Sequence, residues 1–252
     1  MQAGLVSITF RKLSPADVLG LCQESGLTEI EWGGDVHVPH GDIAAASLVG
    51  EQTRAAGIAV AAYGSYYRLA APDGPDFSSV LASAVALGAP VIRAWAGTRS
   101  SAEADEAHWK AVAADALRCA DLAAAQGIFL AYEFHDGTLT DSTGSCLRLL
   151  SATEHPFIRT LWQPPHGRPL EDCVGSLRAV LPWLQHVHVF HWWPTSAHRL
   201  PLSDGAERWA AYLAELRASG REFALLLEFV PGDDPACLTR EAGTLRQLCA
   251  AS

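Results

Sequence analysis

Residues 158–167 read IRTLWQPPHG, an apolar run that ends at Gln163 and is followed by two prolines and a histidine. Proline cannot donate a backbone hydrogen bond to a sheet, so Pro164 and Pro165 mark the end of a strand. We therefore expect Gln163 and His166 to lie at the mouth of the structure to which this strand belongs.

Similar runs recur along the chain, so that eight predicted strands alternate with stretches that carry helix signals. The predicted strands are residues 4–10, 28–32, 58–63, 90–95, 128–134, 158–162, 186–190 and 223–229. Strands that alternate with helices favour parallel pairing with right-handed crossovers. Eight such units in 252 residues predict an α/β fold with one domain over residues 1–252, a single (β/α)8 TIM barrel.

Helix boundaries have signals of their own. The stretch SPAD (14–17) places a capping serine before a first-turn proline, with an acid at the third helical position. Glycines stand where helices should end, at positions 26, 57, 88, 127 and 220. A doubly wound open sheet is the rival fold. The stretch after the first strand reads FRKLSP (10–15), however, and lacks the glycine-rich phosphate turn typical of that fold.

The composition argues against several classes of protein. The formal net charge is −10, and no cluster of Lys and Arg exists, which argues against nucleic acid as a partner. The six cysteines form no CxxC pair, so we expect buried or half-buried free thiols in a cytoplasmic protein. The first residues, MQAGLVSITF, lack the features of a signal peptide, and no apolar run is long enough to span a membrane.

In a barrel of this kind the chemistry lies at the carboxyl ends of the strands. Four residues at or near the ends of consecutive predicted strands stand out: Glu133, Gln163, His188 and Glu228. Two unpaired carboxylates buried together would be severely unfavourable, and a divalent cation between them would remove that cost. A histidine and an amide oxygen can complete its shell, so we predict one divalent metal ion, Mn²⁺, Mg²⁺, Co²⁺ or Zn²⁺.

Structural alternatives stay open for these side chains. Glu133 and Glu228 can instead form buried ion pairs with Arg93 or Arg199, since such pairs occur in barrel mouths. His186 shares a strand face with the predicted ligand two residues later, and alone it is more simply a hydrogen-bonded core residue than a ligand.

Further residues at the strand ends are expected to bind a substrate: His37, Tyr66, Arg93 and Trp95. Tyr66 and Trp95 have flat rings that can stack on the apolar faces of sugars, although part of the aromatic supply simply packs loops onto the rim. The stretch HWWPTSAHRLPL (191–202) is predicted to form a long loop, which could act as a lid over the substrate.

The chain resembles the xylose-isomerase-like TIM barrels, which include sugar phosphate isomerases and epimerases, ketose 3-epimerases, hydroxypyruvate isomerases and inosose dehydratases. The resemblance covers the whole chain and is specific for the fold and the location of the site, but not for the substrate. The motifs that carry it are EIEWGGDVHVP (29–39), AAYGSYYR (61–68), VIRAWAG (91–97), YEFHDGTLTDS (132–142), LWQPPHG (161–167), HVHVFHW (186–192) and LLLEFV (225–230).

The resemblance implies roles for particular residues. In that family a glutamate, an aspartate, a histidine and a glutamate from strands five to eight bind one divalent metal, which implies this role for Glu133, Gln163, His188 and Glu228. It also implies that His166 and Arg199 contact the substrate. The departure is Gln163, because an amide keeps an oxygen donor but removes one negative charge. Weaker metal binding and a stronger Lewis acid follow if Gln163 is a ligand; otherwise it only hydrogen-bonds the substrate.

These features predict a metal-dependent isomerase or epimerase of carbohydrate metabolism that acts on a sugar or keto-polyol. Glu133 and Glu228 are the predicted catalytic residues, which remove and deliver a proton next to a carbonyl through an enediolate. With a leaving group β to the carbanion the same start gives elimination. A lyase or dehydratase acting on a keto-sugar, keto-glycoside or inosose is therefore the first alternative.

Two further alternatives have less support. A non-catalytic sugar-binding barrel is the second alternative, and Gln163 is the best argument for it. A nuclease acting at abasic DNA sites would need three metals and a basic groove, which the net charge disfavours. We expect a small-molecule sugar or polyol as the partner and no membrane partner, and we leave a homo-oligomer open.

Overall fold

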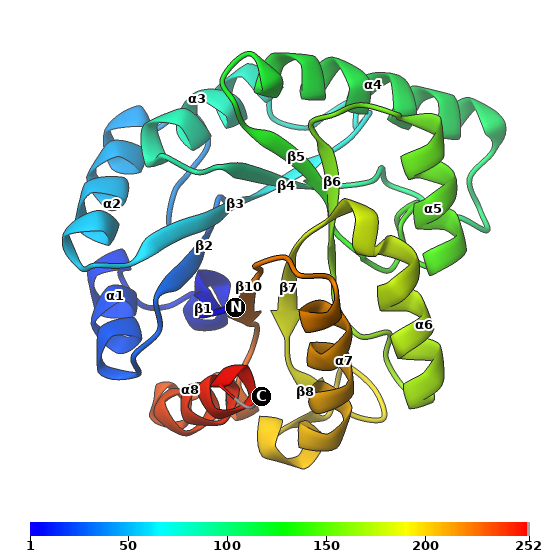
Figure 1. Ribbon diagram of the computed structural model, residues 1–252. Helices are drawn as coiled ribbons and strands as arrows, with labels where there is room; N and C mark the ends of the chain where they lie inside the picture. Colours follow the sequence, from blue (N-terminus) through cyan, green and yellow to red (C-terminus); the bar gives the residue numbers. More distant parts are fainter. Residues whose placement is uncertain (251–252) are drawn as a thin grey trace.

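Eight parallel strands close into a barrel in the computed structural model, which describes residues 1–250 (Figure 1). The hydrogen-bonded order around the barrel is β1-β10-β7-β6-β5-β4-β3-β2. The strands are β1 Gln2–Val6, β2 Glu29–Gly33, β3 Ala59–Arg68, β4 Val91–Trp95, β5 Phe129–Tyr132, β6 Ile158–Trp162, β7 Leu184–Val189 and β10 Ala224–Leu227. The predicted TIM barrel is confirmed.

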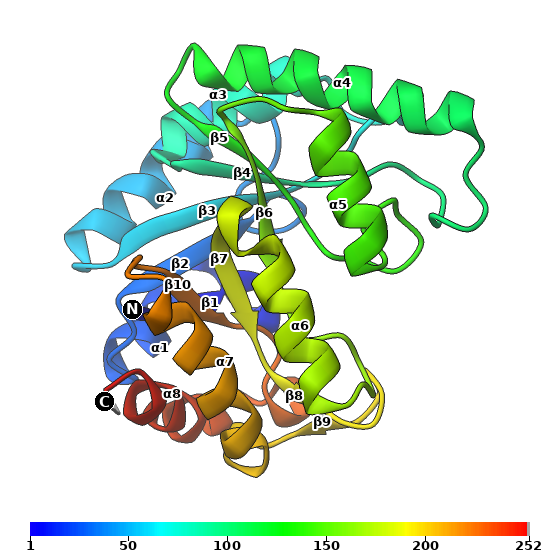
Figure 2. The same cartoon turned by 45° about the vertical axis from the view of Figure 1, so that its right-hand side comes forward.

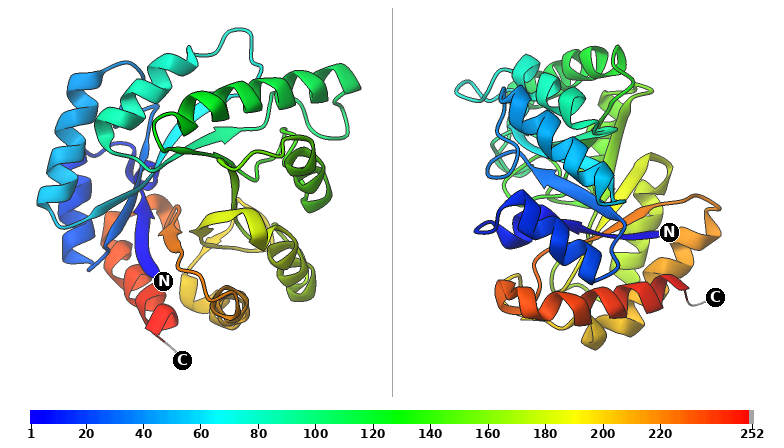
Figure 3. Two further views of the ribbon diagram at one scale, coloured as in Figure 1. Left: turned by 45° about the horizontal axis from the view of Figure 1, so that its top comes forward. Right: turned by 90° about the vertical axis from the view of Figure 1, so that its left-hand side faces the viewer.

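The helices form a ring outside the strands (Figure 3). They are α1 Pro15–Glu24, α2 Ile43–Ala55, α3 Phe77–Leu87, α4 Glu106–Ala124, α5 Thr143–Ala152, α6 Leu170–Val180, α7 Ala206–Ala218 and α8 Pro235–Ala250. The Ser14 side chain accepts from the backbone N–H of Asp17, and the Asp17 side chain accepts in return, so the predicted capping box is present. Gly88 ends α3 in the left-handed conformation at φ 78°, and the other four predicted stop glycines also have positive φ.

Three segments differ most from the prediction. The strand predicted over residues 58–63 continues to Arg68 as β3. The strand predicted over residues 4–10 ends at Val6, because Ser7–Phe10 turn into a short 3-10 helix, η1, and the Ser7 hydroxyl accepts from the N–H of Gly33 at 2.9 Å. The predicted long loop at 191–202 contains a small antiparallel hairpin, β8 His191–Trp192 and β9 Arg199–Leu200 (Figure 2).

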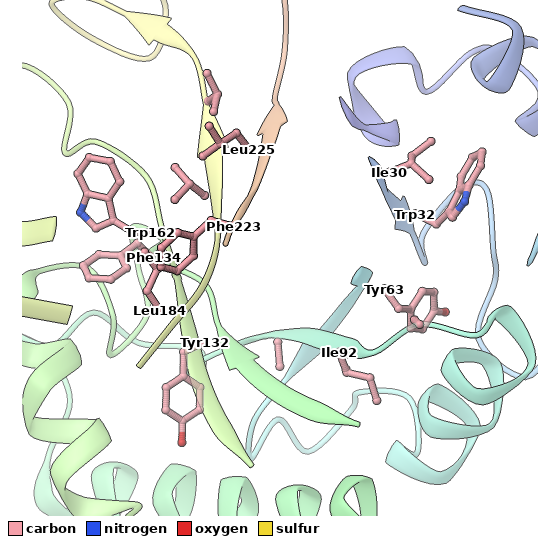
Figure 4. Close-up of a cluster of buried hydrophobic side chains, with 14 of the residues drawn as sticks. Ile30, Trp32, Tyr63, Ile92, Tyr132, Phe134, Trp162, Leu184, Phe223 and Leu225 are labelled. Carbon is pink, nitrogen blue, oxygen red and sulfur yellow. The ribbon is translucent and has the colours of Figure 1, made fainter. Parts of the chain in front are cut away.

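The main hydrophobic core lies between the strands and the helices rather than inside the barrel. Trp32, Tyr63, Ile92 and Tyr132 belong to it, and Figure 4 shows their side chains directed away from the barrel interior. The interior holds only small apolar clusters, one of which is Ala62, Val91 and Ala131. Since side chains alternate along a strand, the inward positions nearer the carboxyl ends are left for polar residues.

The cysteines and the apolar helices were the subjects of two predictions from composition. The six cysteines are free, four of them buried and two half-buried, as predicted. Within residues 1–250 no helix combines the length and the apolar composition needed to cross a membrane.

Candidate functional site

Charged and imidazole side chains gather inside the barrel at the carboxyl ends of the strands. Six of them are almost completely buried: Glu31, Arg93, Glu133, His186, His188 and Glu228. Charges removed from water are tolerated only where they are paired and hydrogen-bonded, so the contacts among these six side chains decide what the site can do.

Glu133, His188 and Glu228 each bring one possible ligand atom to within 4.8 Å of the others. Nδ1 of His188, on β7, lies 3.4 Å from Oε2 of Glu228 and 4.0 Å from Oε1 of Glu133. The two glutamates follow β10 and β5 and are still held in the sheet. The N–H of Glu133 donates to the Ala94 carbonyl at 3.1 Å, and that of Glu228 to the Val189 carbonyl at 3.0 Å. Three of the four predicted metal ligands therefore meet at one point.

Gln163, the fourth predicted ligand, has one end of its amide committed to the backbone. Its Nε2 donates to the carbonyl oxygen of Phe134 at 2.8 Å. Its Oε1 is buried and has no hydrogen-bond partner. A buried acceptor without a partner costs free energy. A cation or a substrate hydroxyl that contacts this oxygen would remove that cost.

Arg93, on β4, joins two of the buried carboxylates. Its Nε donates to Oε1 of Glu31 at 2.6 Å, and its Nη1 donates to Oε2 of Glu133, which also accepts from the indole N–H of Trp95. The buried ion pair considered for Glu133 and Arg93 is therefore present. Within residues 1–250 Glu228 forms no ion pair with an arginine, and its one ion-pair partner within 4.0 Å is the imidazole of His188.

Glu31, in the middle of β2, had no role assigned from the sequence. Its Oε2 accepts from Nε2 of His186 at 3.1 Å and from Nε2 of His188 at 3.2 Å. His186 is thus a hydrogen-bonded core residue, as considered. The signal available in the sequence was an acid within the apolar run TEIEW (28–32).

The charges in this network shift the pKa values of its members. Burial alone would raise the pKa of Glu31, but Arg93 and the two histidines hold it well below its usual value. Burial lowers the pKa of His186. Burial would also lower the pKa of His188, but the carboxylates of Glu228 and Glu31 raise it to about 10. Without a cation in the cluster, both ring nitrogens of His188 therefore carry a hydrogen near neutral pH, and the ring is positively charged.

A cavity of about 770 Å³ lies next to the cluster. Both glutamates and Gln163 line it, and so do four of the residues predicted to bind a substrate: Tyr66, Arg93, Trp95 and His166. His135, to which sequence reasoning gave no role, also lines it. Its ring packs on that of Trp95 with centroids 4.4 Å apart, and its place two residues after Glu133 was the available signal.

His37 does not reach this cavity, although it was predicted to bind the substrate. It is 5% exposed, its Nδ1 lies 2.9 Å from the hydroxyl of Ser7, and its Nε2 lies 3.2 Å from the carbonyl of Leu13. Both ring nitrogens are thus used within the protein, where they tie the loop after β2 to the segment after β1.

Arg199 is not among the residues that line the cavity either. It lies on β9, where its Nη1 pairs with Oδ2 of Asp233 at 2.5 Å. Its guanidinium lies over the ring of Phe229, 4.2 Å from the centroid. Since Phe229 lines the cavity, Arg199 packs against a residue of the cavity wall.

The donor set suits one divalent ion. Nδ1 of His188 and Oε1 of Gln163 are both buried without a hydrogen-bond partner. Two atoms bonded to one ion at about 2.1 Å in a tetrahedral arrangement lie about 3.4 Å apart, which matches the distance between His188 Nδ1 and Glu228 Oε2. With Arg93 paired to Glu31, a divalent ion would balance the charges of Glu133 and Glu228 and leave the buried cluster neutral.

Relatives share this architecture. A curated 3-dehydroshikimate dehydratase from Bacillus anthracis is 28% identical over 103 residues, which cover 38% of this chain and only 35% of that protein. The crystal structure of the probable 3-DHS dehydratase AsbF from Bacillus anthracis has a TM-score of 0.82 at 20% identity, and the similarity covers 98% of this chain and 99% of that one.

Two further solved structures are similar over nearly the whole chain. A D-psicose 3-epimerase in the presence of D-fructose has a TM-score of 0.74 at 15% identity and covers 98% of both chains. The IOLI protein with a bound zinc atom has a TM-score of 0.74 at 14% identity, over 99% of this chain and 96% of that one. Residues 19–248 match the family model described as "Xylose isomerase-like TIM barrel". Because this match spans most of the sequence, the chain belongs to the xylose isomerase-like TIM barrel family.

Proposed function

We propose that the protein is a divalent-metal-dependent isomerase or epimerase that removes a proton next to the carbonyl of a sugar or keto-polyol. The observation that carries this proposal is the buried cluster of Glu133, His188 and Glu228 beside the 770 Å³ cavity. Glu133, His188, Glu228 and the amide oxygen of Gln163 would hold the ion. When bound, the ion would polarise the carbonyl and offset the negative charge of the enediolate. The relatives solved with D-fructose and with zinc support a sugar substrate and a metal.

The two glutamates are placed for different parts of the proton transfer. Oε2 of Glu133 is held by Arg93 and Trp95, so the orientation of this carboxylate is fixed. Glu228 accepts no hydrogen bond from an arginine or an indole within residues 1–250, pairs there only with His188 and lines the cavity, which makes it the better placed group to remove the proton. The strands before them, β5 and β10, are separated by β6 and β7, so the two carboxylates can act on different faces of a substrate.

Neighbouring side chains would orient the substrate. Tyr66 and Trp95 form part of the cavity wall, with ring centroids 5.2 Å apart and an edge-to-face arrangement. His166 stacks on Trp192, and burial lowers its pKa, so its imidazole is neutral. Within residues 1–250 its Nδ1 has no hydrogen-bond partner, so it can accept a hydrogen bond from a substrate hydroxyl.

Elimination is the second candidate, favoured by the similarity to a 3-dehydroshikimate dehydratase of Bacillus anthracis in both sequence and structure. It begins with the same proton transfer to a glutamate. The electron pair of the broken C–H bond then forms a C=C bond, and the hydroxyl on the β carbon leaves with a proton from the site as water. Nothing in the ligand cluster needs to change for this outcome, because the substrate decides it.

Solvent deuterium exchange tests both candidates. We expect the metal-loaded protein to incorporate deuterium next to the carbonyl of at least one member of a panel of ketoses, inososes and 3-keto-glycosides. The Glu228→Gln variant should lose this exchange, whereas Glu222→Gln, an exposed carboxylate before the other end of β10, should keep it. An ultraviolet band from a conjugated enone would identify the dehydratase. If the purified protein binds no metal and exchanges deuterium into none of these compounds, the proposed enzymatic function is refuted.

A further inference from the structure

Glu31 lies outside the set of proposed metal ligands but is linked to two of them, His188 and Glu133. We propose that Glu31 is the positioning residue that sets the geometry of the ligand cluster. The proposal rests on the metal centre proposed above, but it gives a role to a residue that binds neither metal nor substrate. Glu31 holds His188 directly at 3.2 Å. It holds Glu133 through Arg93, whose Nε lies 2.6 Å from Glu31 and whose Nη1 reaches Glu133. Two ligands from β5 and β7 are thus fixed by one residue of β2.

The direction of these hydrogen bonds determines the protonation of the imidazole. A carboxylate only accepts, so Nε2 of His188 must carry the hydrogen. In the neutral ring the lone pair is then on Nδ1, the atom that lies toward Glu228 and Glu133. A histidine ligand is oriented and made more basic by such a bond on its other nitrogen. Glu31 therefore selects the tautomer that can bind an ion between the two glutamates.

The surrounding chain leaves room for this arrangement and limits its movement. Gly64, on β3, pairs with Arg93 in the sheet. A Cβ at Gly64 would lie 2.6 Å from Oε1 of Glu31 and 2.6 Å from Nη2 of Arg93, so a side chain there would displace the ion pair. On the other side, His186 donates to the same oxygen as His188. With donors on both oxygens and no solvent contact, the carboxylate of Glu31 cannot rotate freely.

Glu31, His186 and His188 could also be taken for a second metal site, because their ligand atoms lie within 4.8 Å of one another. The hydrogen bonds argue against it. Both imidazoles direct N–H groups at Glu31, and Arg93 already supplies the positive charge beside it. A divalent ion at this point would lie next to a buried guanidinium. We therefore interpret Glu31, His186 and His188 as a hydrogen-bonded group that orients the proposed ligands of a single ion.

The Glu31→Gln variant tests the proposal with the metal alone as the probe. Arg93 can only donate, so the oxygen of a glutamine faces Arg93 and its NH₂ group faces the histidines. A neutral imidazole can accept from that group only through a nitrogen without hydrogen, so His188 is driven to place its hydrogen on Nδ1. We expect the affinity for Mn²⁺ or Zn²⁺, measured by calorimetry, to fall about 10- to 100-fold. Nitrogen NMR should show the Nε2–H form of His188 in the metal-bound wild type and its loss in the variant.

Glu29→Gln is the matched control, since Glu29 lies on the same face of β2 two residues earlier and away from the cluster. It should keep the metal affinity and the tautomer of the wild type. If Glu31→Gln does not fold, Glu31→Asp keeps the charge beside Arg93 but draws the carboxylate back from the histidines, and it should also weaken metal binding.

Three results would overturn the role of Glu31. These are wild-type metal affinity in a folded Glu31 variant, equal losses in Glu29→Gln and Glu31→Gln, or an Nδ1–H form of His188 in the metal-bound wild type. None of these measurements uses a substrate. A protein that binds metal normally but exchanges no deuterium would instead refute only the proposed reaction.

Discussion

The side-chain nitrogen of Gln163 donates to the backbone oxygen of Phe134 across 2.8 Å. This bond orients the amide, so that the oxygen is the end left without a partner beside the cluster of Glu133 and Glu228. An amide can therefore stand where a carboxylate was expected at the end of this strand, because it satisfies the backbone with one end and leaves an oxygen without a partner at the other. What it cannot supply is the charge.

Replacing Gln163 by Asp adds that charge. Aspartate is shorter by one methylene and does not press a carboxylate against the Phe134 carbonyl. We expect the affinity for the divalent ion to rise about tenfold or more, because ligand charge strengthens binding. We expect kcat to fall, because the added charge weakens the ion as a Lewis acid. Calorimetry and initial rates measure both. Gln163→Leu, which removes the oxygen, should weaken binding; unchanged affinity in both variants would show that Gln163 is not a ligand.

Metal binding should release a proton. Burial opposes a charge on His188, but Glu228 and Glu31 raise its pKa to about 10, so the ion-free ring is protonated at pH 7 to 8. A histidine must be neutral to bind a metal, so the ion displaces this proton and its affinity rises with pH up to about 10. Calorimetry in buffers with different ionisation enthalpies should show about one proton released per ion. A binding enthalpy independent of the buffer would contradict this assignment.

Removal of the ion by a chelator should also abolish deuterium exchange, and addition of the ion should restore it.

Much of the fold could be predicted because its signals are local. The apolar run at 158–162, ended by Pro164 and Pro165, coincides with β6. The ends of parallel barrel strands meet at one face, so finding the strand ends was enough to place Glu133, His188 and Glu228 together. The end of the first strand was missed because the turn at Ser7 depends on a contact with Gly33, 26 residues away in the sequence.

The role of Glu31 could not be predicted, because its partners are remote. An acid in a strand fits equally well with a solvent-facing position, and the contacts that distinguish the two lie 62 residues away at Arg93 and 155 residues away at His186. His37 was expected to bind a substrate, and the structure places it outside the lining of the cavity for a similar reason. A histidine after a strand end looks available for a ligand until the contacts of both ring nitrogens, to Ser7 and to the carbonyl of Leu13, are seen.

Acid should weaken the protein in part through Asp115 on α4. Burial would raise the pKa of Asp115, but the Ala70 N–H, Arg118 and the Tyr67 hydroxyl together lower it. Its folded-state pKa lies below the unfolded value, so its contribution is complete above pH 4 and is lost as the pH falls through the folded-state value. We expect Asp115→Asn to reduce the free energy of unfolding by about 1.5–3 kcal/mol at pH 7. In urea unfolding from pH 7 to 2, this difference should shrink below pH 4, and a constant difference would contradict the role of charge.

The removal of Arg93 should damage the fold as well as the site. Arg93 and Glu31 are 2% and 0% exposed, so loss of the guanidinium leaves a carboxylate without its countercharge in the dry interior. Removing one partner of a buried pair costs about 3–5 kcal/mol, and we expect a loss of this size in urea unfolding of Arg93→Met. Arg148→Met is the matched control, because its pair with Glu106 is 49% and 72% exposed and should contribute less than about 1 kcal/mol. Equal losses in the two variants would mean that water reaches Glu31. Addition of a divalent ion should not fully restore the stability of Arg93→Met. The ion balances the charges of Glu133 and Glu228, whereas Glu31 still lacks the positive charge of Arg93.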